Sequence, residues 1–256
     1  MLLTVLGCSG SVPGPGAPAS GYLLEAEGFL LGIELGNGTF SELQSRRDPF
    51  ELDALLFSHL HADHCSDFSA LSVYRRYHPR PTIDPRANKL PVHAPAEAPT
   101  RFSAQYGTDE ADRAVTNLSD VFDFQALRVG EFQIGPFEVV AAAAAHPCES
   151  FSFRISHGGR SFAYTGDTDV FDGLADLVRG VDVLMAEASW THGGAVIPNL
   201  HMSGRDAGEV ATEAGVGRLL LTHIPPWTDS SAVLAEARAA FRGDVVLVRQ
   251  GASYEV

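Results

Sequence analysis

Histidines and a carboxylate gather in one short segment of the sequence. Four side chains that can bind a metal fall within six residues, at positions His59, His61, Asp63 and His64. Imidazole nitrogens and carboxylate oxygens are ligands for Zn²⁺, and Fe or Mn also accept them. If extended backbone continues past the apolar run 53–57, His59 and His61 point to the same side, because side chains alternate along a strand. The segment therefore predicts a metal site, in preference to an exposed polar loop that holds three histidines by chance.

Three further candidate ligands each end an apolar run. His146 ends the run 139–145, Asp167 follows the run 162–166, and His223 ends the run 219–222. A single histidine at the end of a strand is more often a structural, hydrogen-bonded residue. Repetition of the pattern at separated positions predicts instead that strands of packed sheets end at one edge and bring these side chains together.

The elements that must position these residues follow from apolar periodicity and Gly/Pro punctuation. Strands are expected over residues 2–6, 21–26, 29–35, 53–57, 90–94, 122–128, 132–144, 151–156, 160–165, 181–186, 218–222 and 244–248. Helices are expected over residues 67–77, 96–106, 171–178, 203–214 and 231–241. Strands dominate early and helices alternate with strands later, which predicts two sheets with helices packed outside. No break in composition divides the chain, so residues 1–256 are expected to form a single domain.

Composition places the chain among globular proteins. Of its 256 residues, 45% are hydrophobic and 20% charged, which excludes a disordered or fibrous chain. No apolar run approaches the roughly 20 residues that span a bilayer, and residues 1–7 carry no secretory signal pattern, so no membrane contact is expected. Three cysteines cannot form a closed set of disulfides, which favours the reducing cytoplasm.

The charge balance narrows the substrates. The sequence holds 18 Lys plus Arg against 32 Asp plus Glu, a formal net charge of −14. Long nucleic acids bind largely through neutralisation of their phosphates, so stable nucleic-acid binding is not expected. A small anionic substrate therefore requires something strongly positive inside the site.

The motifs and their order resemble those of the metallo-β-lactamase-fold hydrolases. They run His59-x-His61-x-Asp63-His64, then His146, then Asp167 in Thr165-Gly166-Asp167-Thr168, then His223. The resemblance implies an α+β fold, an αββα sandwich in which two mixed β-sheets pack face to face with helices on both outer faces. It also implies that His59, His61 and His146 hold one metal. Asp63, His64 and His223 would hold the second, with Asp167 bridging the pair.

Other segments are similar to one branch of that family. Aspartate at the bridging position and a liganding aspartate in the first motif are typical of its two-metal esterases and phosphodiesterases. The segments Glu187-Ala188-Ser189-Trp190 and Leu200-His201-Met202-Ser203-Gly204 resemble the tRNA 3′-processing endonucleases and their small phosphodiesterase relatives. The resemblance implies that His201 donates a proton to the leaving oxygen and that Glu187 orients it. Purely structural roles for both residues are the alternatives, His201 standing beside the helix N-cap Ser203.

Two features disfavour tRNA processing. The endonucleases of this branch grip tRNA with a long arm, commonly inserted between the third-motif histidine and the bridging aspartate. Here that interval is 21 positions, enough for a hairpin. A tRNA clamp also requires a basic surface, which an acidic chain does not favour. One basic segment, 75–89, which includes Arg75 and Arg76, is a candidate to hold a phosphate or ribose, or else forms a solvated face.

A closer resemblance covers nearly the whole chain. Segments 7–11, 20–24, 74–79, 186–192 and 222–228 are similar to actinobacterial cyclic-nucleotide phosphodiesterases of this fold. The resemblance implies hydrolysis of 3′,5′-cyclic AMP to 5′-AMP, with two divalent metals, Zn²⁺ first and Mn or Fe as alternatives. A hydroxide shared by the metals would attack phosphorus, with His201 as general acid and Asp63 as ligand and acceptor of the nucleophile's proton.

Three other classes of function are alternatives to a cyclic-nucleotide phosphodiesterase. They are a tRNA 3′-endonuclease-like RNA hydrolase, a lactonase, thioesterase or β-lactamase, and a metal-bound ligand sensor without activity. The expected partner is a small phosphodiester, and because dimers are common in this branch a homodimer is expected.

Several residues near these motifs are expected to support the site. Glu34 stands where the family's turn often carries aspartate, and a bracing role is expected for it. Cys65 and Cys148 adjoin or closely follow candidate ligands, and both are interpreted as buried thiols. Aromatic residues that either stack on a purine or pack internally are Phe151, Phe153, Trp190 and Trp227.

Overall fold

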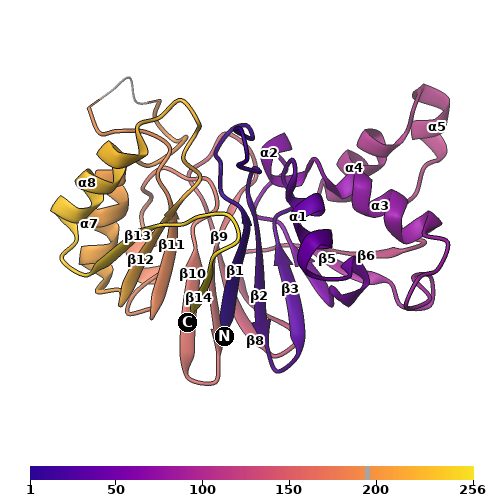
Figure 1. Cartoon of the computed structure of the whole chain (residues 1–256), viewed down its shortest axis with the longest axis horizontal. Helices are drawn as coiled ribbons and strands as arrows, with labels where there is room; N and C mark the ends of the chain where they lie inside the picture. The colour runs from indigo at the N-terminus through magenta and orange to yellow at the C-terminus, as the bar shows by residue number, and fades with distance from the viewer. Residues whose placement is uncertain (194–196) are drawn as a thin grey trace.

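The strands form two seven-stranded sheets, in the computed structural model that describes residues 1–193 and 197–256 (Figure 1). The first sheet has the order β14-β1-β2-β3-β4-β5-β6. Its strands are β1 (Leu2–Gly7), β2 (Gly21–Ala26), β3 (Phe29–Ile33), β4 (Ala54–Leu56), β5 (Leu90–Ala94), β6 (Phe122–Ala126) and β14 (Ser253–Glu255). Strands β14 to β3 pair antiparallel, and β3 to β6 pair parallel, so the sheet is mixed.

The second sheet repeats this arrangement in the order β13-β12-β11-β10-β9-β8-β7. Its strands are β7 (Gly130–Ile134), β8 (Phe137–Ala143), β9 (Phe151–His157), β10 (Arg160–Tyr164), β11 (Val183–Glu187), β12 (Arg218–Thr222) and β13 (Asp244–Leu247). The pairs from β7 to β10 are antiparallel and those from β10 to β13 are parallel. Parallel strands end at a common edge, and this edge positions the site.

Helices cover the outer faces of both sheets (Figure 1). They are α1 (Thr39–Arg46), α2 (Ala62–Cys65), α3 (Phe68–Tyr77), α4 (Ala98–Tyr106), α5 (Glu110–Val115), α6 (Leu174–Leu177), α7 (Gly204–Ala214) and α8 (Ser230–Ala240), with a 3₁₀ turn at Pro49–Glu51. Within the described residues, no helix has both the length and the apolar composition needed to cross a bilayer.

Three apolar clusters hold the layers together. One lies between the sheets and joins residues of both, such as Leu24 and Ile155. A second packs the first sheet against α1, α3 and α4, and a third packs the second sheet against α6, α7 and α8. A buried hydrogen bond of 2.6 Å between Tyr22 Oη and Thr222 Oγ1 also links the two sheets. The expected α+β sandwich, helix on sheet on sheet on helix, is confirmed.

One predicted strand, 132–144, is wrong. The structure divides this segment into β7 and β8, which pair antiparallel. The turn between them contains Gly135, with φ of +53°, and Pro136. A left-handed backbone suits glycine, and proline lacks the N–H that a continuing strand would use. The chain therefore reverses inside an apolar run that has the periodicity of a single strand.

Gly36 holds the end of β3 against the metal-binding segment. A Cβ placed on Gly36 would lie 1.9 Å from the carbonyl oxygen of Asp63. Gly36→Ala is therefore expected to displace Asp63, to destabilise the fold by about 1–3 kcal/mol and to lower the metal content measured after gel filtration. Gly28→Ala is the control, because no atom lies within 4 Å there and only its positive φ is strained. Equal metal content in both variants would contradict this role for Gly36.

Candidate metal centre

The segment after β4 carries four of the predicted residues, in irregular backbone and one helical turn. β4 ends at Leu56, so the expected continuation of extended strand through His59 and His61 is wrong. The two imidazoles nevertheless meet, with His59 Nε2 3.0 Å from His61 Nδ1. The short helix α2 then places Asp63 and His64, both buried, on the inner side.

The other three predicted ligands follow β8, β10 and β12, as the sequence pattern indicates. Asp167 comes after Gly166, whose φ of +58° and close approach to Ser58 exclude a larger side chain. His223 itself has a left-handed backbone, with φ of +57°, and its N–H donates to the Cys8 carbonyl at 3.0 Å. Strained non-glycine backbone of this kind is concentrated at functional sites.

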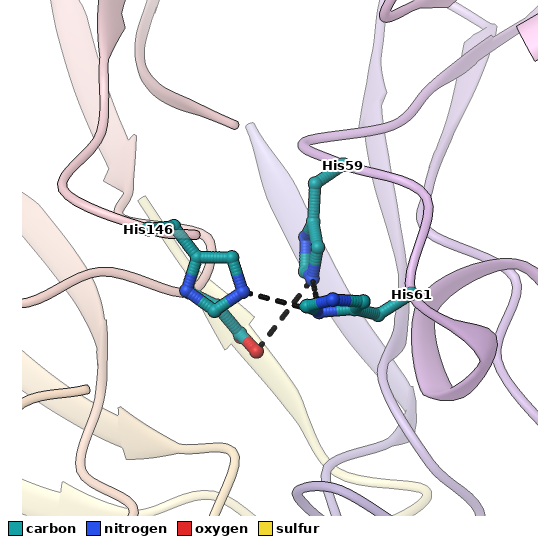
Figure 2. A group of neighbouring side chains, drawn as sticks. His59, His61 and His146 are labelled. Atoms are coloured by element: carbon teal, nitrogen blue, oxygen red, sulfur yellow. Dashed lines mark hydrogen bonds and ion pairs between the residues drawn. The ribbon is translucent and has the colours of Figure 1, made fainter. Parts of the chain in front are cut away.

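His59, His61 and His146 point their rings toward one another, as Figure 2 shows. His146 Nε2 lies 3.1 Å from His61 Nδ1, and His59 Nε2 lies 3.7 Å from Asp167 Oδ2. With Asp167, the three histidines form a cluster whose ligand atoms all lie within 4.8 Å of one another. His61 is the exposed member of the group, so the cluster opens to solvent on that side.

A second cluster shares Asp167 with the first. It joins Asp63, His64, Asp167 and His223, all buried, again with ligand atoms within 4.8 Å of one another. His223 Nε2 lies 3.0 Å from Asp63 Oδ2 and 3.3 Å from Asp167 Oδ2. His64 Nε2 lies 3.2 Å from both His223 Nε2 and Asp167 Oδ1. Two clusters that share one carboxylate are compatible with a binuclear metal site.

Hydrogen bonds behind the rings fix which nitrogen faces each cluster. His146 Nδ1 is 3.0 Å from the Leu200 carbonyl, which only accepts, so this nitrogen carries the proton. Ser58 Oγ donates to Glu34 Oε1 and therefore accepts from His59 Nδ1 at 3.0 Å. In each ring the unprotonated Nε2 is left to face the cluster, the arrangement that metal-ligating histidines use.

His223 is oriented in the same way by residues at the end of β11, the strand that pairs with β12 in the second sheet. Ser189 Oγ donates to Glu187 Oε2 at 2.8 Å and accepts from His223 Nδ1 at 3.0 Å. Each buried glutamate thus acts through one serine on one histidine: Glu34 through Ser58, and Glu187 through Ser189. Glu34 Oε1 also lies 3.5 Å from His64 Nδ1, which agrees with the bracing role expected for this residue.

The charge and lone pairs of these clusters fit divalent cations. Burial lowers the pKa of His59 well below its usual value and the pKa of His146 to about 4, so both rings are neutral ligands. Burial also lowers the pKa of His64, but the carboxylates of Asp167, Asp63 and Glu34 outweigh it and raise that pKa well above normal. Asp167 Oδ1 is buried without a hydrogen-bond partner among the described residues. Converging nitrogen lone pairs and excess carboxylate charge are balanced by metal ions.

His201 and Glu187 form an ion pair beside the second cluster. His201 Nδ1 lies 2.9 Å from Glu187 Oε1, and the indole of Trp190 packs edge-on against the imidazole, with centroids 5.3 Å apart. Burial lowers the pKa of His201, but Glu187, Asp167 and Asp63 outweigh it and raise that pKa to about 9. The imidazole is 5.4 Å from the ring of His223, between centroids.

The basic segment 75–89 is used in packing. Arg75 is 2% exposed, lies against the rings of Phe50 and Phe122, and donates to the Asn88 carbonyl at 2.8 Å. Arg76 is paired with Asp120, its Nη2 lying 2.7 Å from Oδ1. These contacts favour the structural alternative over a phosphate or ribose site.

The two cysteines near the ligands differ. Cys65 is buried, as expected, and burial raises its pKa to about 12. Cys148 is exposed, so its expected burial is wrong, and its Sγ lies 4.0 Å from His61 Nε2.

Of the four aromatic residues proposed to stack on a purine, only Trp227 has a largely exposed side chain. Phe151 and Phe153 are buried in the cluster between the sheets, which excludes stacking on a ligand. Trp190 packs on His201, and Trp227 is 69% exposed. A purine therefore cannot stack on Phe151 or Phe153 and must bind to another surface.

Sequence reasoning missed Ser58, Ser189 and the Leu200 carbonyl. Ser58 directly precedes His59, and Ser189 lies two residues after Glu187, so position alone offered a weak signal. Their roles depend on contacts between segments far apart in the chain, which spacing does not reveal.

Two face-to-face sheets with a shared His/Asp cluster at the strand ends define a metallo-β-lactamase-fold protein. Residues 35–224 match the model of the family described as the beta-lactamase superfamily domain. The chain belongs to this superfamily and is a metal-dependent hydrolase by family. The uncharacterized protein Rv1339 of Mycobacterium tuberculosis (strain ATCC 25618 / H37Rv) is 46% identical, over 99% of this chain and 92% of that protein.

Two other proteins are similar over their whole length. The probable metallo-hydrolase YhfI of Bacillus subtilis (strain 168) is 27% identical, with all of both chains covered. The crystal structure of YhfI has a TM-score of 0.85, at 26% identity, and covers 99% of this chain and 98% of that one. The human short-form tRNase Z has a TM-score of 0.74, covering 100% and 99%, and at 20% identity it shows the fold alone.

Removal of the Ser189 hydroxyl is expected to weaken metal binding. In Ser189→Ala, His223 Nδ1 loses its acceptor, and loss of such a partner typically costs about 10–100-fold in metal affinity. A competition titration with a chromophoric chelator measures this affinity. Ser45→Ala is the control, because Ser45 is exposed on α1 and donates only to the Glu42 carbonyl. Unchanged metal affinity in Ser189→Ala would show that the serine does not support metal binding by His223.

Proposed function

We propose that the protein is a two-metal phosphodiesterase that hydrolyses 3′,5′-cyclic AMP to 5′-AMP. The observation that carries the proposal is the ion pair between the partly buried His201 and the buried Glu187, beside two ligand clusters that share Asp167. A phosphodiester is slow to hydrolyse because an anion must be attacked and an alkoxide must leave. Metal ions held by the clusters would promote attack on the anion, and His201 would protonate the leaving alkoxide.

The proposed ligand sets divide the seven side chains. His59, His61 and His146 hold one ion, Asp63, His64 and His223 hold the other, and Asp167 contacts both. Two divalent ions held there supply Lewis acidity toward phosphate oxygens and lower the pKa of water toward about 7. Zn²⁺ suits this histidine-rich set, and Mn or Fe bind the same ligands.

The chain's own residues carry the proton transfers. Glu187 accepts a hydrogen bond from His201 Nδ1 and favours the protonated ring, whose Nε2–H is then donated to the leaving 3′ oxygen. General acid catalysis of this kind typically contributes about 10²–10⁴-fold. Asp63 is a proposed ligand that also accepts the proton of the attacking water. Trp190 packs edge-on against the His201 ring and fixes the orientation of that ring.

A small substrate is favoured over RNA by the segment between His146 and Asp167. It folds as the hairpin β9–β10, and contains no room for a protruding arm beyond the turn 158–159. The net charge of −14 also disfavours a long polyanion. A tRNA 3′-endonuclease-like activity is the second candidate, favoured by the structural likeness to tRNase Z. A ligand-sensor function would leave the His201–Glu187 pair without a catalytic role, and lactonase, thioesterase and β-lactamase activities are alternatives that a substrate screen distinguishes.

Location and assembly complete the proposal. Cys8, Cys65 and Cys148 are free thiols, which is typical of the cytoplasm, and we place the protein there. A homodimer is proposed on the resemblance to its branch, and sedimentation equilibrium tests it.

A metal-defined substrate screen tests the function. Apo protein reloaded with Zn²⁺, Mn²⁺ or Fe²⁺ is assayed on cyclic AMP, cyclic GMP, 2′,3′-cyclic nucleotides and precursor tRNA, and also on a lactone, a thioester and nitrocefin. The proposal expects chelator-sensitive formation of 5′-AMP from 3′,5′-cyclic AMP. Mature-length tRNA products without cyclic-nucleotide turnover would establish the RNA alternative in its place. Hydrolysis of only lactones, thioesters or nitrocefin would overturn phosphodiester chemistry.

A further inference from the structure

We propose that a cavity beside His61, on the surface formed by α4, binds the adenine base of the substrate. This inference rests on the proposed function and names the subsite that distinguishes a nucleotide from other phosphodiesters. The cavity has a volume of about 450 Å³. The residues that line it include the apolar Leu60, Pro95 and Ala104, and also Arg101, Glu97 and Cys148.

The cavity is continuous with the metal centre through His61. This residue presents Nδ1 to His59 and His146, while the same ring lines the cavity. Cys148, 4.0 Å from the outward His61 Nε2, lines it as well. Because His61 is the exposed member of the first cluster, a phosphate at the metals projects its substituent toward this side.

The shape and chemistry of the cavity suit a planar heterocycle. Sites for small molecules have volumes of about 300–1,000 Å³, mostly apolar walls and a few polar groups that fix orientation. Leu60, Pro95 and Ala104 supply apolar surface, and a purine has two apolar faces with polar groups confined to its edge. A ribose phosphate chain alone would gain little from such walls.

Charged side chains at the rim select an amino-bearing base. Arg101 lies on α4 and has no side-chain hydrogen bond or ion pair among the residues that the structure describes, so its guanidinium is available to stack on a base. Glu97 stands one turn before Arg101, and Glu149 is held by the Ala96 N–H, which donates to its Oε2 at 3.2 Å. These carboxylates accept hydrogen bonds, which an exocyclic amino group of adenine donates.

The other aromatic surfaces near the centre do not offer this site. Phe151 and Phe153 are in the core between the sheets, and Trp190 is packed against His201. Trp227 is 69% exposed but does not line the cavity, so a base held there would stack on the cavity wall itself.

Filling the cavity tests the proposal. Ala104 is exposed and lines the cavity, so Ala104→Trp blocks it without disturbing the core. Ala114→Trp, on an exposed position of α5 outside the cavity, is the matched control. Each metal-loaded protein is assayed on cyclic AMP and on methyl p-nitrophenyl phosphate, a phosphodiester without a base.

The expected result is a selective loss. Ala104→Trp should lower kcat/KM for cyclic AMP on the order of 10- to 100-fold, mostly through KM, because stacking of one base contributes this much. Its rate on methyl p-nitrophenyl phosphate should stay close to that of the wild type, and Ala114→Trp should change neither substrate. Arg101→Ala should reproduce the loss in weaker form.

Binding of the product separates this inference from the proposed function. Calorimetric titration of metal-loaded protein with 5′-AMP is expected to show binding that Ala104→Trp weakens and Ala114→Trp does not. Equal losses on both substrates, or unchanged 5′-AMP affinity in Ala104→Trp, would overturn the base site. If the wild type hydrolyses neither phosphodiester, the proposed function fails, and the 5′-AMP titration still decides whether the cavity binds a base.

Discussion

The His64→Ala protein is expected to bind one metal ion per chain in place of two and to lose phosphodiester turnover. His64 Nε2 lies 3.2 Å from both His223 Nε2 and Asp167 Oδ1, at the centre of the second cluster. The first cluster does not include His64, so it keeps its full set of ligands. Turnover falls because one ion cannot stabilise both the attacking and the leaving oxygen of an in-line displacement.

Metal content by mass spectrometry and turnover are measured on the same preparation. His157→Ala serves as the control, because His157 lies on β9 and its Nδ1 donates to the Pro136 carbonyl. Circular dichroism establishes that both variants are folded. Two bound ions and wild-type turnover in His64→Ala would show that this residue is not a ligand.

The second large effect is expected from His201→Ala, and its size should depend on the leaving group. A ribose 3′ oxygen is a poor leaving group and needs a proton, whereas p-nitrophenolate leaves without one. The variant should therefore lose about 10²–10⁴-fold in kcat on cyclic AMP. On bis-p-nitrophenyl phosphate the loss should be far smaller, and metal content should be unchanged, because His201 is outside both shared-aspartate clusters.

His192→Ala controls for the loss of a neighbouring histidine. The His192 side chain is 45% exposed and contacts Asp206 and Ser203, and among the described residues it makes no hydrogen bond or ion pair with His201 or Glu187. Its removal should leave the two rates in their wild-type ratio. Equal losses of His201→Ala on both substrates would assign the histidine a structural or metal-binding role in place of proton donation.

The sequence predicted the convergence of the site because the relevant information is local. His146, Asp167 and His223 follow β8, β10 and β12, which run in the same direction in the second sheet and therefore end at one edge. The order of the motifs and the 21-position interval of the hairpin could likewise be interpreted without coordinates. Fold class followed from the succession of strands and helices for the same reason.

What the sequence did not reveal depends on contacts between distant segments. Ser189 meets His223 across 34 positions, and Ser58 meets Glu34 across 24. Nothing in the periodicity of either segment reports a hydrogen bond to the other. Two short elements were also not predicted from the sequence. The strand β14 has three residues and pairs with β1 at the edge of the first sheet. The helix α1 buries Thr39, Phe40 and Leu43 in an otherwise polar segment.

Stepwise metal reconstitution tests the central claim most directly. Apo protein is titrated with Zn²⁺, and bound metal and hydrolysis of 3′,5′-cyclic AMP are measured at every step. Two ligand clusters that share Asp167 predict that turnover stays low at one bound ion per chain and reaches its full value at two. Full turnover at one ion, or turnover that persists in the metal-free protein, would contradict a binuclear phosphodiesterase.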